Sequence, residues 1–182
     1  NPNVLSLNSG TAALHIALML AGVGPDDEVI STALTAEPTN VAIKLVGAKV
    51  VWADVDPATG LIAPQSIRQK ISPRTKAIIV VHYAGMVCDM DRINAIAADA
   101  GIPVIEDAAE GLGSRYDGQV CGTFGRYGVL SFNGNKMITT SGGGALICPD
   151  EEAKKKIMFY ATQARESYPY YQHEEIGYNY RM

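Results

Sequence analysis

The amine of Lys136 is the most chemically versatile side chain in this sequence. It ends the stretch SFNGNK at 131–136, directly after a short apolar pair at 129–130. Desolvation favours the neutral form of an amine, and a neutral amine attacks a carbonyl carbon to form a Schiff base. A solvated surface lysine is the ordinary alternative. The run TTSGGG at 139–144 reads by default as a flexible turn, but it also admits close approach of a bulky group and so favours a functional role.

A second candidate group is the carboxylate of Asp107, which closes a predicted strand at 102–107. Two alanines follow it, so a poorly solvated pocket is expected around it. In low dielectric a carboxylate pairs strongly with a cation such as a protonated ring nitrogen. Its neighbour Glu106 points the opposite way, because side chains alternate along a strand. An Asx-type cap of the following turn is the alternative for Asp107.

A third feature is the motif SGT at 9–11, which stands between a predicted strand and a predicted helix. The unpaired amides and the positive dipole end of a helix N-terminus bind phosphate. Gly10 allows close backbone approach, and Thr11 adds a hydroxyl donor. An ordinary helix cap is the alternative when the motif is taken alone. The tail GYNYRM at 177–182 fits a binding surface and simple packing equally well.

The elements that must position these groups alternate between short β-branched runs and longer helical ones. Strands are predicted at 4–7, 28–31, 49–54, 77–82, 102–107, 128–132 and 145–148, and helices at 12–21, 38–46, 64–71, 90–100 and 150–165. Continuous apolar runs such as 78–81 are typical of strands covered on both faces. The pattern predicts an α/β fold, a three-layer αβα arrangement with a mostly parallel sheet. In such a sheet ligands bind beyond the carboxyl ends of the strands, where the candidate groups stand.

Length and composition fit one domain of 182 residues. The formal net charge of −4 gives no reason to expect nucleic acid or an anionic membrane as a partner. The apolar stretch at 12–23 is interrupted by His15 and Gly22 and is too short to span a bilayer. The three cysteines at 88, 121 and 148 form no CxxC pair, so neither a disulfide framework nor a zinc site is supported, and a cytoplasmic location is expected.

Several other sites were weighed against a simple structural role. Asp89 and Asp91 resemble a metal pair, but an acidic first turn of the helix at 90–100 is the favoured interpretation. His15 lies in an apolar helix and is expected in the core. His82, at the carboxyl end of a predicted strand, is a weaker candidate for the pocket. The glycines at 111 and 113 do not complete a GxGxxG motif, because Tyr116 occupies the third position.

An amine, a carboxylate for a pyridinium nitrogen and a phosphate cradle are the parts that pyridoxal 5'-phosphate requires. The motifs NSGTAAL at 8–14, EDAAEGLG at 106–113 and SFNGNK at 131–136 closely resemble the DegT-type nucleotide-sugar aminotransferases. The glycines at 142–144 and the stretch GYNYRM at 177–182 are also similar to that family. The resemblance implies the large domain of the type I pyridoxal-phosphate-dependent transferase fold, found in the aspartate aminotransferase superfamily. It further implies that residues 1–182 are a fragment, without the N-terminal segment and C-terminal small domain of relatives.

The resemblance also implies a role for individual residues. Lys136 is expected to hold the cofactor as a Schiff base, and Asp107 to keep the ring nitrogen protonated. Glu110, where relatives often carry Gln or His, is expected near the phenolic oxygen of the ring. Asn179 is expected to reach the phosphate of a neighbouring subunit, which implies a homodimer with shared active sites. The implied cofactor-binding set is Gly10, Thr11, Ala12, Thr35, Asp107, Glu110, Ser131, Asn133, Lys136 and Asn179.

One stretch departs from the family pattern. Many relatives place an aromatic residue after the second strand to stack on the cofactor ring, whereas the stretch ALTAEPTN at 33–40 contains none. Either Thr35 or Ala36 is expected at that place. Some family members carry His instead of the lysine and dehydrate sugars, and Lys136 argues against that chemistry.

The implied activity is transfer of an amino group from glutamate to a keto carbon of a nucleotide-linked 4-keto-6-deoxy sugar, for bacterial surface polysaccharide or glycan biosynthesis. Glutamate and the nucleotide ketosugar are the expected small-molecule partners. Amination of a keto-cyclitol is the alternative within the same chemistry. A catalytically inert cofactor-binding protein is the alternative outside it.

Overall fold

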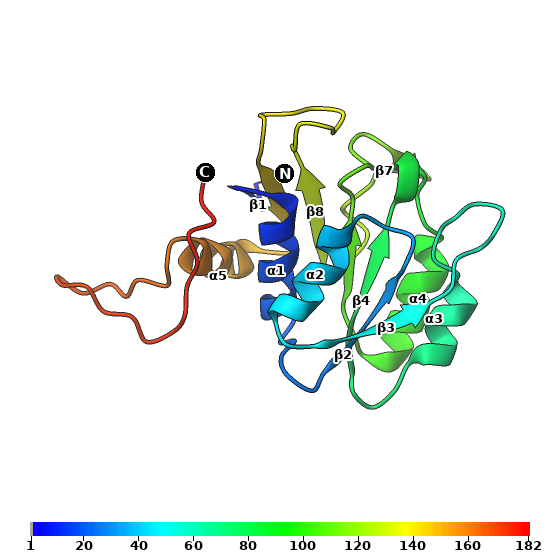
Figure 1. The fold of residues 1–182 in the computed structure, drawn as a ribbon, viewed down its shortest axis with the longest axis horizontal. Helices are drawn as coiled ribbons and strands as arrows, with labels where there is room; N and C mark the ends of the chain where they lie inside the picture. Colours follow the sequence, from blue (N-terminus) through cyan, green and yellow to red (C-terminus); the bar gives the residue numbers. More distant parts are fainter. Residues whose placement is uncertain (1) are drawn as a thin grey trace.

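The computed structural model describes residues 2–182 (Figure 1). Its strands are β1 (Val4–Leu7), β2 (Glu28–Thr32), β3 (Lys49–Ala53), β4 (Thr75–Val81), β5 (Val104–Asp107), β6 (Arg115–Tyr116), β7 (Gln119–Val120), β8 (Tyr127–Ser131) and β9 (Gly144–Ile147). Its helices are α1 (Gly10–Leu20), α2 (Glu37–Leu45), α3 (Pro64–Lys70), α4 (Met90–Ala100) and α5 (Glu151–Ala161), with a short 3-10 turn, η1 (Tyr83–Gly85). Every predicted strand and helix is present, whereas η1 and the small β6–β7 hairpin were not predicted.

Seven strands form one sheet in the order β1-β9-β8-β5-β4-β2-β3. The run from β8 through β5, β4 and β2 to β3 is parallel, and β9 pairs antiparallel with both β8 and β1. Strand β9 is therefore the one reversed strand of this sheet, and the prediction of a mostly parallel sheet is confirmed. Because β1, β2, β4, β5 and β8 run the same way, their carboxyl ends meet at one edge of the sheet.

Helices cover both faces of this sheet, as the continuous apolar strands predicted (Figure 1). On one face, α1, α2 and α5 pack on side chains such as Ile79, Ile105 and Val129. On the other face, α3 and α4 pack on side chains such as Ile78 and Val80. Successive residues of β4 thus enter opposite cores, because side chains alternate along a strand. Helices on both faces of one sheet make the three-layer αβα arrangement that the sequence predicted.

The helix ends have identifiable local causes. Ser9 caps α1, its Oγ accepting the Ala12 N–H at 3.0 Å. Asp89 caps α4 in the same way, accepting the Arg92 N–H at 3.2 Å. This confirms that the acidic pair at 89 and 91 begins a helix. Gly101 ends α4 with φ 67°, the left-handed conformation that glycine adopts without strain.

The last helix was predicted at 150–165, but α5 ends at Ala161. The C-terminal tail of the chain returns to α5 and donates hydrogen bonds to carbonyls of its last turn. The Tyr178 N–H donates to the Tyr160 carbonyl at 2.7 Å, and the Tyr180 N–H donates to the Ala161 carbonyl at 3.0 Å. Between the helix and this return, the chain forms a loop that extends from the body (Figure 1). Among the described residues, no helix has both the length and the apolar character needed to cross a membrane.

Candidate active site

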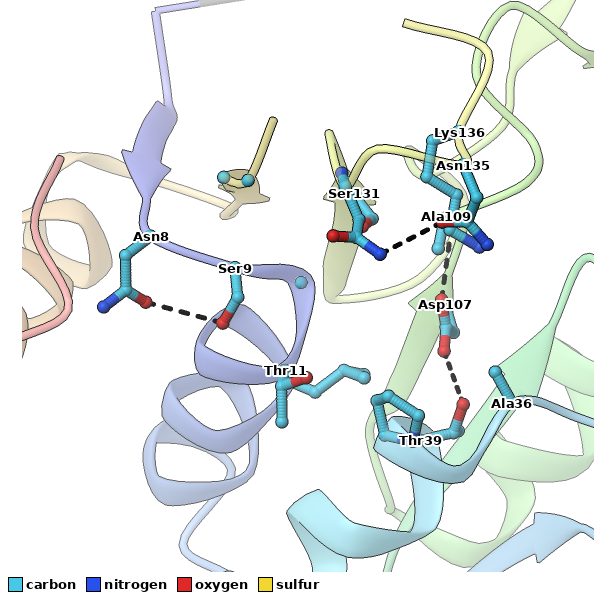
Figure 2. A pocket seen from close by; sticks show the side chains of 16 residues that line it. Asn8, Ser9, Thr11, Ala36, Thr39, Asp107, Ala109, Ser131, Asn135 and Lys136 are labelled. Carbon is cyan, nitrogen blue, oxygen red and sulfur yellow. Dashed lines mark hydrogen bonds between the residues drawn. The ribbon is translucent and has the colours of Figure 1, made fainter. Parts of the chain in front are cut away.

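A cavity of about 320 Å³ lies where the carboxyl ends of β1, β5 and β8 meet the start of α1 (Figure 2). Six of the ten residues predicted to bind the cofactor line it. They are Gly10, Thr11, Asp107, Ser131, Asn133 and Lys136. They come from three separate parts of the sequence. The parallel sheet brings them together by placing several strand ends on one edge.

The start of α1 forms one wall of this cavity. The first intrahelical bond runs from the Ala13 N–H to the Ser9 carbonyl, so the amides before it have no partner within the helix. Gly10 packs directly on β8: a Cβ at this position would lie 3.1 Å from the Cβ of Ser131. The last glycine of the 142–144 run is also needed for close packing, because a Cβ at Gly144 would lie 2.5 Å from the Ser9 carbonyl carbon. These contacts leave a helix N-terminus open to the cavity, with the Ser131 side chain beside it.

Asp107 contributes a carboxylate that is only 6% exposed. Its Oδ2 accepts a hydrogen bond from the Thr39 hydroxyl at 2.7 Å, and its Oδ1 accepts the Ala109 N–H at 3.2 Å. Burial raises the pKa of Asp107. The Thr39 and Ala109 hydrogen bonds and the charge of Lys136 oppose that rise. The net effect is a raised pKa of Asp107. Its negative charge is therefore incompletely compensated, which favours a cationic ligand in the cavity.

Lys136 faces the same cavity with a side chain that is 14% exposed. Its Nζ lies 3.5 Å from Oε1 of Glu110, a carboxylate at the rim that is 42% exposed. The other oxygen of Glu110 accepts the Ala84 N–H at 2.8 Å, which ties η1 to this side of the site. Glu110 itself lines a neighbouring pocket, shared with Lys136, rather than the cavity described above. An amine, a buried carboxylate and a helix N-terminus thus converge on one space.

Four predicted residues lie outside the cavity lining. The Ala12 N–H is engaged by the Ser9 cap, and Glu110 stands at the rim as described. The Thr35 hydroxyl contacts the Thr39 hydroxyl at 2.7 Å, and Ala36 lines the cavity instead. Of the two residues considered for the missing aromatic position, Ala36 is therefore the one at the cavity. Asn179 is exposed, and its backbone carbonyl accepts a hydrogen bond from the Asn8 side chain at 3.0 Å.

The sequence interpretation missed other residues of the lining. The polar ones are Asn8, Thr39 and Asn135. Asn8 and Asn135 are neighbours in the sequence of residues predicted at the site, so their place in the lining could have been predicted. Thr39 gave no such signal, because it is 68 positions from Asp107 in the sequence.

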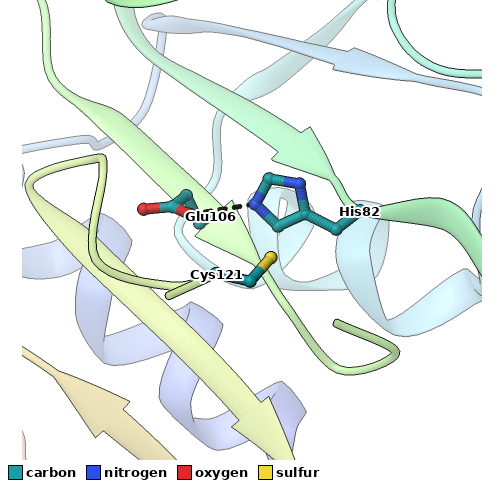
Figure 3. A group of neighbouring side chains, drawn as sticks. All are labelled: His82, Glu106 and Cys121. Atoms are coloured by element: carbon teal, nitrogen blue, oxygen red, sulfur yellow. Dashed lines mark hydrogen bonds and ion pairs between the residues drawn. The ribbon is translucent and has the colours of Figure 1, made fainter. Parts of the chain in front are cut away.

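His82 lies behind the site, not in it. Its side chain is fully buried and forms a cluster with Glu106 and Cys121 whose possible ligand atoms lie within 4.8 Å of one another (Figure 3). Nδ1 of His82 accepts the Cys88 N–H at 3.2 Å, so Nε2 carries the proton and donates to Oε2 of Glu106 at 2.9 Å. Burial raises the pKa of the Cys121 thiol to about 12. Both ring nitrogens of His82 are thus engaged in hydrogen bonds, and the cluster is a buried polar network behind the cavity.

Glu106 also organises the loop that leads into β8. Its Oε2 accepts the Gly122 N–H at 2.8 Å, in addition to His82. Its Oε1 accepts the Phe124 and Gly125 N–H groups at 2.6 and 2.5 Å. Four donors from two segments therefore converge on one carboxylate whose side chain is fully buried.

We expect Glu106→Gln to destabilise the fold by about 3 kcal/mol, because either orientation of the amide turns an NH₂ group toward two buried N–H donors. Urea unfolding followed by circular dichroism measures this change. Glu152→Gln, an exposed change on α5, is the control and should have little effect. An unchanged midpoint for Glu106→Gln would show that the four contacts contribute nothing net to stability.

Comparisons with known proteins show which family and which individual proteins this chain is similar to. The family model described as the DegT/DnrJ/EryC1/StrS aminotransferase family matches residues 1–182. The chain is 44% identical to EpsN of Bacillus subtilis (strain 168), over 97% of this chain and 47% of that protein. It is 41% identical to GDP-perosamine synthase of Escherichia coli O157:H7, over 97% of this chain and 49% of that protein. It is 40% identical to 3-amino-5-hydroxybenzoate synthase of Amycolatopsis mediterranei (strain S699), over 84% and 39% of the two chains.

Solved structures show the same fold. The aminotransferase from Psychrobacter cryohalolentis superposes with a TM-score of 0.92 at 37% identity, covering 98% of this chain and 48% of that one. NtdA from Bacillus subtilis, solved with bound cofactor PMP, superposes with a TM-score of 0.90 at 33% identity, covering 98% and 41%. The chain spans about half the length, or less, of the relatives that it matches.

Proposed function

This chain belongs to the DegT/DnrJ/EryC1/StrS aminotransferase family, and from that premise we propose that it forms the cofactor-binding part of a pyridoxal-phosphate-dependent transaminase. One observation carries the proposal: Lys136 and Asp107 line the same cavity, opposite the N-terminus of α1. A lysine and an acid that faced separate spaces would be incompatible with this chemistry. Residues 1–182 would then be the large domain of the enzyme.

The residues present fit pyridoxal phosphate at three of its polar positions. The amides at the start of α1 and the hydroxyls of Thr11 and Ser131 suit the phosphate dianion, which a helix N-terminus attracts. The buried Asp107 carboxylate suits a protonated ring nitrogen. The Lys136 amine suits covalent attachment of the aldehyde carbon. Ala36, in place of an aromatic residue, leaves that wall of the cavity without a stacking ring.

When bound, the cofactor supplies a carbonyl carbon that takes up the amino group and a ring that withdraws electrons. The protein supplies the rest. Asp107 holds the proton on the ring nitrogen, and the α1 amides anchor the phosphate. With its amine free, Lys136 would accept the Cα proton of the donor substrate at Nζ and would deliver it to the carbon on the other side of the amino nitrogen, a 1,3-proton transfer. Glu110, 3.5 Å from that nitrogen, holds the amine toward the rim of the cavity.

For substrates, we propose glutamate as donor and a nucleotide-linked 4-keto-6-deoxy sugar as acceptor, in bacterial surface polysaccharide or glycan biosynthesis. The similarity to GDP-perosamine synthases of two bacteria supports this choice. A keto-cyclitol is the second candidate, and the similarity to 3-amino-5-hydroxybenzoate synthase favours keeping a non-nucleotide ring acceptor in view.

We also propose a homodimer with shared active sites and a cytoplasmic location. Asn179 stands outside the cavity of its own chain and is exposed, as a residue that serves a neighbouring copy would be. Large apolar side chains are exposed beside the site, including Met137 at 75% and Ile138 at 57%. The three cysteines are unpaired, which suits a reducing compartment.

The test uses the complete protein that contains this chain. Pyridoxal phosphate is expected to give a visible absorption band, and reduction with borohydride should fix the cofactor on the peptide bearing Lys136. Adding glutamate should then remove the band. A panel of nucleotide ketosugars and keto-cyclitols, with mass-spectrometric detection of aminated product, identifies the acceptor. A band that glutamate leaves unchanged would support an inert cofactor-binding protein instead.

A further inference from the structure

The hydroxyl of Thr39 makes a contact that helix geometry alone does not explain. Thr39 lies in the first turn of α2, lines the cavity and is 1% exposed. Threonine hydroxyls inside helices commonly bond to the carbonyl one turn earlier. Here the hydroxyl reaches across to Oδ2 of Asp107, at the end of β5, at 2.7 Å (Figure 2). That length is ordinary for an O–H···O hydrogen bond.

Thr35 extends this contact into a short chain. When Asp107 is ionised, its oxygens only accept, so the one hydroxyl proton of Thr39 is committed to the carboxylate. The contact of 2.7 Å between the two threonine hydroxyls must then run from Thr35 to Thr39. Hydrogen bonds in series polarise one another, so Thr35 strengthens the bond that Thr39 donates.

The two oxygens of Asp107 are held from two directions. Thr39 engages Oδ2 from α2, and the Ala109 N–H engages Oδ1 at 3.2 Å from the chain just after β5. Rotation of the carboxylate would break one contact or both. The plane of the group is therefore fixed before any ligand enters the cavity.

We propose that Thr39, supported by Thr35, is a positioning residue that locks the Asp107 carboxylate in one orientation toward the protonated ring nitrogen of the bound cofactor. This inference rests on the proposed function. Thr39 acts through Asp107 and makes its contribution before the cofactor binds. Its side chain thereby connects α2, an element without a predicted catalytic group, to the chemistry of the site.

The experiment compares four threonine variants in the complete protein. Thr39→Val keeps the shape and removes the donor, and we expect the affinity for pyridoxal phosphate to fall about 10-fold to 100-fold. Thr39→Ser restores the donor and should return close to wild-type affinity. Thr35→Val should cause a smaller loss. Thr75→Val is the matched control: Thr75 is 7% exposed, but its hydroxyl accepts the Ser72 N–H at the opposite end of the sheet.

The decisive measurement is the ¹⁵N chemical shift of the ring nitrogen of labelled pyridoxal phosphate, followed against pH. Thr39→Val should lower the pH at which this nitrogen loses its proton, whereas Thr75→Val should not move it. A purely structural role for Thr39 would lower the melting temperature and leave the nitrogen signal unchanged, and that result overturns the proposal. If wild-type protein fails to attach the cofactor at Lys136, the proposed function itself fails, which is a different outcome.

Discussion

Lys136→Ala is expected to reduce amino transfer by about 10⁴-fold or more in the complete protein, because it removes both the covalent attachment and the proton carrier. The variant should still bind pyridoxal phosphate, since the α1 amides and Asp107 remain. Its absorption spectrum should resemble that of the free aldehyde, and borohydride should leave no cofactor on the protein. Steady-state rates with glutamate, together with this reduction, measure the effect.

Two further variants sharpen this prediction. Lys136→Arg keeps the positive charge beside Glu110, but a guanidinium does not deprotonate in proteins and so is equally inactive. Lys155→Ala removes an exposed lysine from α5 and should retain full activity. Near-normal turnover by either Lys136 variant would contradict the assignment of this amine.

Asp107→Asn is expected to reduce turnover by about 10²-fold to 10⁴-fold, because an amide does not hold the ring nitrogen protonated. Covalent attachment at Lys136 should persist, so borohydride should still fix the cofactor. Asp117→Asn, an exposed change in the β6–β7 turn, is the control and should be neutral. A variant at Asp107 with wild-type turnover would remove the carboxylate from the mechanism.

Although Asp107→Asn should reduce turnover, it should increase the free energy of unfolding of the cofactor-free protein. Burial raises the pKa of Asp107 above its ordinary value of 3.8, so ionisation of this group opposes folding. The stability that the neutral acid provides is present below the unfolded-state pKa and is lost as the pH rises through the folded-state pKa. At pH 7, cofactor-free Asp107→Asn should therefore be more stable than wild type in urea, and the difference should shrink near pH 4.

Asp107 thus exchanges stability for function. Its carboxylate is held by Thr39 and Ala109 but lacks a full counterion until a cation enters the cavity. Binding of a protonated ring should offset the free-energy cost of burying the ionised Asp107 carboxylate. The cofactor is therefore expected to stabilise wild type more than Asp107→Asn. Melting temperatures with and without pyridoxal phosphate test the comparison.

The sheet and the main chemical groups could be predicted because their signals are local. Short β-branched apolar runs mark the strands, and a cap motif such as Ser9-Gly10-Thr11 marks a helix start within a few residues. The convergence of Thr11, Asp107 and Lys136 then required only one further rule, that parallel strands end on one edge. These parts depend on backbone geometry, which short sequence segments determine.

Only the tertiary structure decided which side chains complete the site. The choice between Thr35 and Ala36 depended on how the short connection between β2 and α2 is placed, which no sequence pattern determined. The hydrogen bond between Thr39 and Asp107 joins residues 68 positions apart, and the contacts of Glu106 join the end of β5 to the loop before β8. Such contacts carry no periodicity or motif, because they depend on the packing of whole elements. The sequence was therefore sufficient to place Lys136, Asp107 and the start of α1 at one edge of the sheet, whereas the residues that contact them were decided only by the packing of the layers.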